Sequence, residues 1–143
     1  METMEFTGFG DHSIVCGYTP LCSEFIKSLK LMNVPIVIIV RDMELATALK
    51  SEGYIVYREQ ADNIEVLRKA GLKKAKNVYI CSPDDGYNLL VALTINNFKQ
   101  QEQLKCKVTV IVNSSRNAEK IQNFCEETID ISKVLNDYMF KIK

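Results

Sequence analysis

Short apolar runs recur along the chain, and each is followed by a segment whose apolar residues return every three or four positions. That period is typical of an amphipathic helix, whereas a short continuous run rich in β-branched residues predicts a strand. The run 34–40 does not alternate between apolar and polar residues, which favours a strand buried on both faces of a parallel sheet. The predicted strands are 13–16, 34–40, 54–57, 77–81, 107–112 and 128–131. The predicted helices are 20–32, 43–51, 64–70, 85–99, 117–125 and 133–143.

Strands and helices alternate throughout the chain. This pattern predicts a Rossmann-like, doubly wound α/β fold with about six parallel strands in the order 3-2-1-4-5-6 and helices on both faces. With 143 residues the chain has the length of one domain. We interpret residues 1–11 as a leader or linker, 12–132 as the Rossmann-like lobe and 133–143 as a further helix.

Two of the predicted helices carry apolar stripes. In the first helix, Pro20 suits the first position and Asn33 suits the C-terminal end. Its stripe contains Leu21, Phe25, Leu29 and Met32, with Cys22 and Ile26 beside them. The stripe of the last helix contains Val134, Leu135, Tyr138, Met139 and Ile142. Either this last helix folds back on its own sheet or it packs on another chain, as in a homodimer or a higher homo-oligomer.

Charge and cysteine content exclude several classes of protein. Eighteen Lys and Arg residues balance eighteen Asp and Glu residues. A net charge of zero argues against a nucleic-acid partner, which usually requires a basic surface. The five cysteines form no C-x-x-C pair and no metal-ligand spacing, which favours the reducing cytoplasm. No apolar run approaches the roughly 18–20 residues of a membrane span, and no signal peptide precedes the first strand.

The turn after the first predicted strand lies where a Rossmann fold holds a dinucleotide. The fingerprint G-x-G-x-x-G retains only its first glycine, Gly17, with Thr19 and Cys22 at the other two positions. Thr19 precedes a proline and suits a helix N-cap, so its hydroxyl can take an amide that a phosphate would otherwise bind. Two interpretations remain open, a nucleotide-binding loop and a capped helix start.

The end of the second predicted strand lacks the acid that a dinucleotide site uses for its ribose hydroxyls. Val40 stands at the expected position, and Asp42 follows two residues later. Arg41 could contact a phosphate or simply be an exposed arginine at a strand end.

The stretch 82–88 lies at the carboxyl end of the fourth predicted strand, beside the point where the strand order reverses. Ligands of open α/β sheets bind at this point, but Ser and Asp at a helix start also cap free amides. Asp84 and Asn88 are the candidate ligand contacts, and Asn88 is the residue that capping explains least.

Catalytic chemistry finds little support in the sequence. The chain has one histidine, His12, and neither G-x-S-x-G nor G-x-x-x-x-G-K-[ST] occurs. Asp84 and Asp85 are neighbours at a helix start and need not converge on one substrate. We therefore expect that the chain is not an enzyme and that it has no catalytic residues and no metal site.

Several stretches in order together resemble the N-terminal lobe of the RCK domain, also called KTN or the Trk-type N-terminal domain. They are Asp11–Gly17 with Leu21, Val34–Asp42, Val66–Gly71, Asn77–Cys81, Asp84-Asp85 with Asn88–Leu90, Asn117–Lys120 and Ile129–Ser132. The resemblance covers about 11–143 and implies a cytoplasmic regulator of potassium channels or potassium-uptake systems at the inner face of the cell membrane. It further implies a dimer that assembles into a gating ring beneath a membrane pore. The family's last helix crosses to the partner, which would cover the stripe over 134–142.

The chain departs from the family members that bind NAD or ATP. Those members carry the glycine fingerprint, an acid where Val40 stands and often Gly-Asp where Glu59-Gln60 stand. Our first hypothesis is a regulatory and assembly domain with a degenerate nucleotide site and no cofactor. The alternative is a sensor of NAD(H), ATP, ADP or AMP that uses a remnant cleft formed by Gly17, Thr19, Arg41, Asp84 and Asn88. An oxidoreductase is the third possibility, and it would need a further substrate-binding region.

Overall fold

The computed structural model describes residues 10–141, and they form a six-stranded sheet in which all strand pairs are parallel. The strand order β3-β2-β1-β4-β5-β6 confirms the predicted order. The strands are β1 (Ser13–Cys16), β2 (Ile36–Val40), β3 (Ile55–Arg58), β4 (Asn77–Ile80), β5 (Lys107–Val112) and β6 (Glu127–Asp130). The helices are α1 (Pro20–Leu31), α2 (Met43–Ser51), α3 (Ile64–Lys69), α4 (Asp85–Glu102), α5 (Ser115–Ile121) and α6 (Ile131–Lys141), and two short 3₁₀ turns cover Leu72–Lys74 and Gln122–Phe124.

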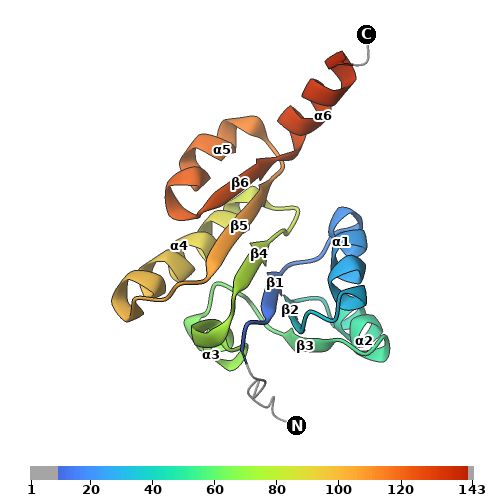
Figure 1. The fold of residues 1–143 in the computed structure, drawn as a ribbon, viewed down its shortest axis with the longest axis vertical. Coiled ribbons are helices and arrows are strands. Elements are labelled where there is room, and N and C mark those ends of the chain that lie inside the picture. Colours follow the sequence, from blue (N-terminus) through green and yellow to red (C-terminus); the bar gives the residue numbers. More distant parts are fainter. Residues whose placement is uncertain (1–9, 142–143) are drawn as a thin grey trace.

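Helices lie on both faces of the sheet (Figure 1), as the alternation of elements predicts. The helices α3, α4 and α5 pack on one face over a core that includes Val78, Ile80, Val108 and Val110. The helices α1 and α2 pack on the other face, where they cover the half of the sheet formed by β1, β2 and β3. All five residues of β2 are buried, as the lack of alternation in that run predicts.

Most element boundaries differ from the sequence prediction by one or more residues, and three of the differences have a clear local description. β2 begins at Ile36, because Pro35 cannot donate to a ladder and instead accepts the amide of Ser13 at 2.9 Å. α4 continues to Glu102, and Gln103 ends it in the left-handed region with φ +54°. The predicted helix 117–125 is replaced by α5, which begins at Ser115, and by a 3₁₀ turn over Gln122–Phe124.

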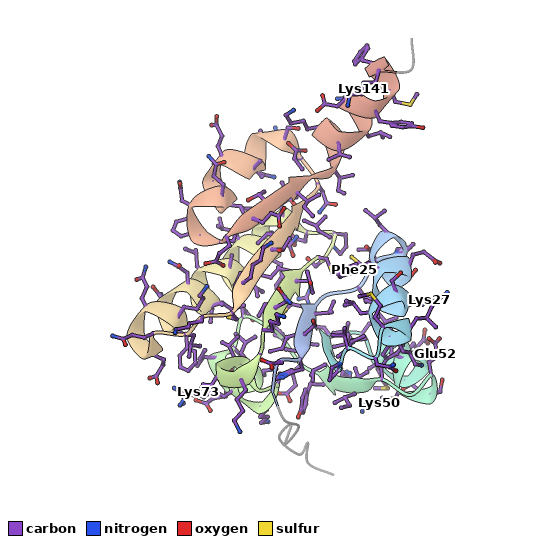
Figure 2. The ribbon with its side chains drawn as sticks, in the orientation of Figure 1. Phe25, Lys27, Lys50, Glu52, Lys73 and Lys141 are labelled. Atoms are coloured by element: carbon purple, nitrogen blue, oxygen red, sulfur yellow. The ribbon has the colours of Figure 1, made fainter. Side chains whose placement is uncertain are left out.

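The buried face of α1 differs in part from the predicted stripe. Cys22, Ile26 and Leu29 are buried, whereas Leu21 and Met32 are largely exposed. The positions 22, 26 and 29 lie one helical turn apart and face β1 and β2, so this half of the stripe forms the core. Phe25 points from α1 toward the sheet (Figure 2), where its ring meets the ring of Tyr79 edge-on with 4.7 Å between centroids.

The last helix, α6, projects from the body of the molecule and does not fold back on its own sheet (Figure 1). It has no buried residue, and its exposed apolar side chains are Val134, Leu135, Tyr138, Met139 and Phe140. Ile142, which the sequence analysis places on the same stripe, and the predicted leader up to residue 9 lie outside the described residues. Within 10–141, none of the helices combines the length and the apolar character that crossing a membrane requires.

The two leucines near the end of α1 provide a test of which face is buried. Leu29 is 8% exposed and Leu31 is 84% exposed. We expect Leu29→Ala to lower the free energy of unfolding by about 2–5 kcal/mol, as for a buried leucine, and Leu31→Ala by no more than about 0.5 kcal/mol. Urea denaturation of the two variants measures the difference. Similar losses in both would contradict the described orientation of α1.

Candidate functional site

A cavity of about 430 Å³ opens at the carboxyl ends of β1, β2 and β4, where the strand order reverses. Ligands of open α/β folds bind at this position. The cavity is lined by Gly17, Tyr18, Ile39, Val40, Arg41, Asp42, Leu45, Ser82, Pro83 and Tyr87. Of the five candidate residues from the sequence, Gly17 and Arg41 are therefore brought together, and Thr19, Asp84 and Asn88 are not in this lining.

Gly17 is required at its position by the backbone of the next strand. Its φ is +100°, and a Cβ atom there would lie 2.7 Å from the amide nitrogen of Ser82 and 2.9 Å from its Cα. The amide of Gly17 also donates to the carbonyl of Ile39 at 2.9 Å. The glycine thus allows the turn after β1 to pass directly against the end of β4, whether or not a ligand is bound.

Thr19 caps α1, as the sequence predicts. Its hydroxyl accepts the amide of Cys22 at 3.2 Å, and its extended backbone places it outside the first turn of the helix. Because this amide is one of the free donors of the helix N-terminus, the cap occupies a group that an anion would otherwise bind.

The cavity is apolar at the position that holds a ribose in dinucleotide-binding folds. Val40 ends β2 and lines the cavity with a side chain that cannot accept a hydrogen bond. Asp42 is the one carboxylate in the lining, and its Oδ2 accepts the amide of Leu45 at 2.8 Å to cap α2. One oxygen of this carboxylate is therefore engaged by the helix that follows it.

Arg41 and Tyr87 form the polar wall of the cavity. The Arg41 guanidinium lies 4.6 Å from the centre of the Tyr87 ring, a distance typical of a cation–π contact. The Tyr87 hydroxyl accepts the amide of Ala61 at 2.6 Å, and burial raises the pKa of this phenol above its ordinary value. The Tyr87 ring, held by this hydrogen bond, thus lies beside the positive charge of Arg41 in the cavity lining.

Asp84 and Asp85, at the start of α4, both accept hydrogen bonds from main-chain amides. Asp84 Oδ1 accepts the amides of Gly86 at 2.9 Å and Tyr87 at 3.3 Å. Asp85 accepts the amides of Asn113 and Ser114 and the side chains of Asn113 and Asn117, at 2.8–3.1 Å. Burial alone would raise the pKa of Asp85, but these hydrogen bonds together hold it below its ordinary value. The carboxylate therefore holds the loop after β5 against α4.

Asn88 is completely buried, and its amide group is used by the backbone around it. Its Oδ1 accepts the amide of Ser82 at 3.0 Å, and its Nδ2 donates to the carbonyls of Ser82 at 2.9 Å and Ile111 at 3.3 Å. Helix capping is a poor explanation for an asparagine at this position of the sequence. The structure shows that it joins the end of β4 to β5 from within the first turns of α4.

The single histidine, His12, lies in the interior and does not line the cavity. The His12 ring is buried with Nε2 2.8 Å from the carbonyl of Ala70, and burial lowers its pKa. Among residues 10–141, no group of three His, Cys, Asp or Glu side chains is arranged to hold a metal ion.

Tyr87 and Ser82 line the cavity, whereas the candidate contacts predicted from the stretch 82–88 are Asp84 and Asn88. A residue in the first turn after a parallel strand lies at the edge of the sheet where ligands bind. The position of Tyr87 in the sequence therefore indicates that it can line the cavity. Ser82 belongs to the same stretch, but its close approach to Gly17 depends on the packing of β1 against β4.

A comparison with protein families finds that the model of the TrkA-N domain matches residues 13–136. No curated protein sequence matches the chain. The fold is similar to the TrkA-N domain of the inner membrane protein YbaL from Escherichia coli, with 15% identity, a TM-score of 0.84 and coverage of 94% of this chain and 97% of that one.

Two further solved structures share the fold. The GsuK channel bound to NAD has 18% identity and a TM-score of 0.83, over 96% of this chain and 25% of the channel chain. The chain therefore spans about a quarter of GsuK. The Kef CTD of Shewanella denitrificans in its AMP-bound form has 14% identity and a TM-score of 0.69, over 87% of this chain and 75% of that one.

Gly17 and Gly53 have similar φ values but differ in how close other atoms come. Replacing each by alanine therefore separates the cost of a positive φ from the cost of a close contact. Gly17 has φ +100° and Gly53 has φ +95°, but a Cβ at Gly53 would meet only Lys30 Nζ, at 3.8 Å. We expect Gly53→Ala to cost about 1–2 kcal/mol of stability from strain in φ. Gly17→Ala should cost about 1–3 kcal/mol more, because Ser82 must move. Thermal and urea unfolding measure both, and equal losses would show that the turn does not need the close approach.

Proposed function

Because this chain belongs to the TrkA-N domain family, we propose that it is a cytoplasmic regulatory and assembly domain of a potassium channel or a potassium transporter. The observation that carries the proposal is the combination of this fold with an open cavity at the point where its strand order reverses. Ligand binding at that cavity would alter the relation between the two halves of the sheet. The chain would pass this change to a membrane pore and perform no reaction of its own.

We propose further that the nucleotide site is degenerate. Three features support this: Val40 replaces the acid that holds a ribose, Thr19 occupies an amide of the α1 N-terminus, and Asp42 is engaged by α2. Each feature removes a group that would bind the ribose or the phosphates of a dinucleotide. Together they favour weak binding of NAD(H) and adenine nucleotides, or binding of a different ligand.

A nucleotide sensor is the second candidate function, and the cavity itself favours it. The cavity keeps a volume of about 430 Å³ beside Gly17, and Arg41 supplies a positive charge at its wall. The solved structures of similar fold include a channel bound to NAD and a domain bound to AMP. A sensor would use Gly17 and Arg41 for the phosphates and the Tyr87 ring for a base.

Assembly is supported by α6. Its apolar side chains Val134, Leu135, Tyr138, Met139 and Phe140 are 57–65% exposed, and the helix projects from the sheet (Figure 1). An exposed stripe of this kind is typical of a surface that a partner covers. We propose that a second copy of the chain covers it, in a homodimer or a higher homo-oligomer attached to a membrane pore-forming domain or subunit.

Thermal unfolding in the presence of NADH, ATP, ADP or AMP separates the two candidate functions. A ligand present at about 100 times its dissociation constant adds roughly 2.7 kcal/mol of stability, which corresponds to several degrees for a domain of this size. A degenerate site predicts no such shift at millimolar ligand, because the ribose and phosphate partners are missing. The sensor predicts a shift that Arg41→Ala abolishes.

Arg68→Ala is the matched control for that experiment. Arg68 also lies over an aromatic ring, that of Phe98 at 5.1 Å, but it is not among the residues that line the cavity. A nucleotide-dependent shift of the unfolding temperature that persists in Arg68→Ala and disappears in Arg41→Ala would support the nucleotide sensor and contradict the degenerate site.

Charged substitutions on α6 test whether this helix mediates assembly. The double variant Tyr138→Glu and Met139→Glu places two carboxylates on the exposed stripe, and we expect it to reduce the mass measured by light scattering from that of an oligomer to that of a monomer. Replacing the exposed Leu31 and Met32 on α1 in the same way is the control, and it should leave the mass unchanged. An oligomer that persists in the α6 variant would contradict the role of this helix.

A further inference from the structure

Three of the five cysteines meet beside the Gly17 turn. Cys16 ends β1, Cys22 lies in the first turn of α1, and Cys81 directly follows β4. The Cys81 amide donates to the Cys16 carbonyl at 2.9 Å, so the two strand ends are joined through the main chain. The side chains of Cys22 and Cys81 are within hydrogen-bonding contact. The Cys22 sulfur also lies 3.9 Å from the Cys81 carbonyl, and the Cys81 sulfur lies 3.7 Å from the Gly17 carbonyl.

The surroundings of these two sulfurs make them chemically different. The hydroxyl of Thr19 donates to the Cys22 sulfur at 3.2 Å, and the side chain of Cys81 makes a hydrogen-bonding contact with it. The hydrogen bond from Cys81 is the main cause that lowers the pKa of the Cys22 thiol, against an opposing effect of burial. The same contact and burial raise the pKa of Cys81. Of the two sulfurs, Cys22 is therefore the one whose deprotonation the surroundings favour.

A groove runs beside the two cysteines, each of which is at most 3% exposed. It has a volume of about 390 Å³ and lies between α1 and the part of the sheet that α1 leaves uncovered. Cys22 and Cys81 line it, together with Phe25, Tyr79 and Ile111. Figure 2 shows Phe25 at the side of α1 that faces this groove. Cys16 does not line it, and burial raises the pKa of that thiol to about 12.

We propose that Cys22 and Cys81 form a reversible redox pair, in which a peroxide oxidises Cys22 and Cys81 then closes a disulfide between α1 and the end of β4. In the first step the Cys22 thiolate attacks one oxygen of hydrogen peroxide, the O–O bond breaks, and the leaving hydroxide takes up a proton to form water. This leaves a sulfenic acid on Cys22. The Cys81 sulfur then attacks that sulfur, the S–O bond breaks, and the hydroxyl group leaves as water with the Cys81 proton. The two sulfurs together lose two electrons, and the peroxide gains them.

The disulfide would act on the turn that borders the candidate site. Cys81 already contacts the Gly17 carbonyl, and the next residue, Ser82, lies against the Gly17 Cα. A covalent link from Cys22 to Cys81 would fix the start of α1, the turn and the end of β4 relative to one another. A dithiol such as dithiothreitol would reverse the link by thiol–disulfide exchange. The proposal does not depend on whether the cavity binds a nucleotide.

Peptide mapping of the whole chain tests the pair. The reduced protein is treated with hydrogen peroxide, its remaining thiols are alkylated without reductant, and its peptides are analysed by mass spectrometry. We expect a linked peptide pair that contains Cys22 and Cys81, formed before oxidation of Cys125 and lost again on treatment with dithiothreitol. Cys125 is the discriminating comparison, because it is more exposed than the other four cysteines and would react first if exposure alone controlled oxidation.

Single variants resolve the order of the steps. In Cys81→Ser no link can close, so the sulfenic acid on Cys22 should persist and react with dimedone, whereas in Cys22→Ser the Cys81 thiol should stay reduced. Cys125→Ser is the matched control and should form the link at the wild-type rate. The oxidised wild-type chain should also unfold at a higher temperature than the reduced chain, and Cys81→Ser should lose this difference.

Three results would overturn the proposal. They are oxidation of Cys125 or Cys106 ahead of Cys22, a link that joins two chains instead of Cys22 and Cys81 of one chain, and thiols of Cys22 and Cys81 that stay unchanged while peroxide oxidises Cys125. Each is read from the peptides of the wild-type chain, so the test stands even where a variant fails to fold.

Discussion

The close approach of the β4 end to the Gly17 turn is the constraint on which the rest of this structure depends. The Ser82 main chain comes so near that a Cβ at position 17 would lie 2.7 Å from its amide nitrogen. Asn88 holds Ser82 in place from α4 with two hydrogen bonds and reaches β5 with a third. The turn, the end of β4 and the start of α4 therefore form one connected unit, and the cavity of the candidate site lies at its edge.

Around this unit, side chains cap helix N-termini and so engage backbone amides that a ligand could otherwise bind. Thr19 caps α1, Asp42 caps α2 and Asp84 caps α4, so three helix starts near the carboxyl edge are already satisfied by side chains. Each cap stabilises its helix by about 1 kcal/mol, and each also removes an amide from the set that binds anions in related folds. The same residues that stabilise the lobe thus support our proposal of a degenerate nucleotide site. Arg41 remains as the positive charge in the cavity wall.

The two faces of the sheet are covered unequally. The helices α3, α4 and α5 cover one face, whereas on the other face α1 and α2 lie over β1, β2 and β3 and leave a groove over the rest (Figure 1). Cys22 and Cys81 line that groove, and our proposed redox pair would react from it. The apolar stripe of α6 is a separate exposed surface, and our proposed assembly would cover it. Regulation by a ligand, by oxidation and by assembly would therefore act on neighbouring parts of one lobe.

Much of this architecture is determined by local sequence. The alternation of apolar runs and helical periods predicts the strands, their order and the helices, and Thr19 before a proline predicts the cap that the structure contains. Gly17 and the absence of an acid at Val40 are likewise visible in the sequence, because a strand end places them. Only the tertiary structure decides which half of the α1 stripe is buried, what Asn88 binds, that Arg41 lies over Tyr87 and that Cys22 meets Cys81. The contacts of Asn88, of Arg41 with Tyr87 and of Cys22 with Cys81 join segments that are far apart in the chain. The parallel strand order and its register bring these segments to the same edge, and the spacing of apolar residues within one segment cannot predict such long-range contacts.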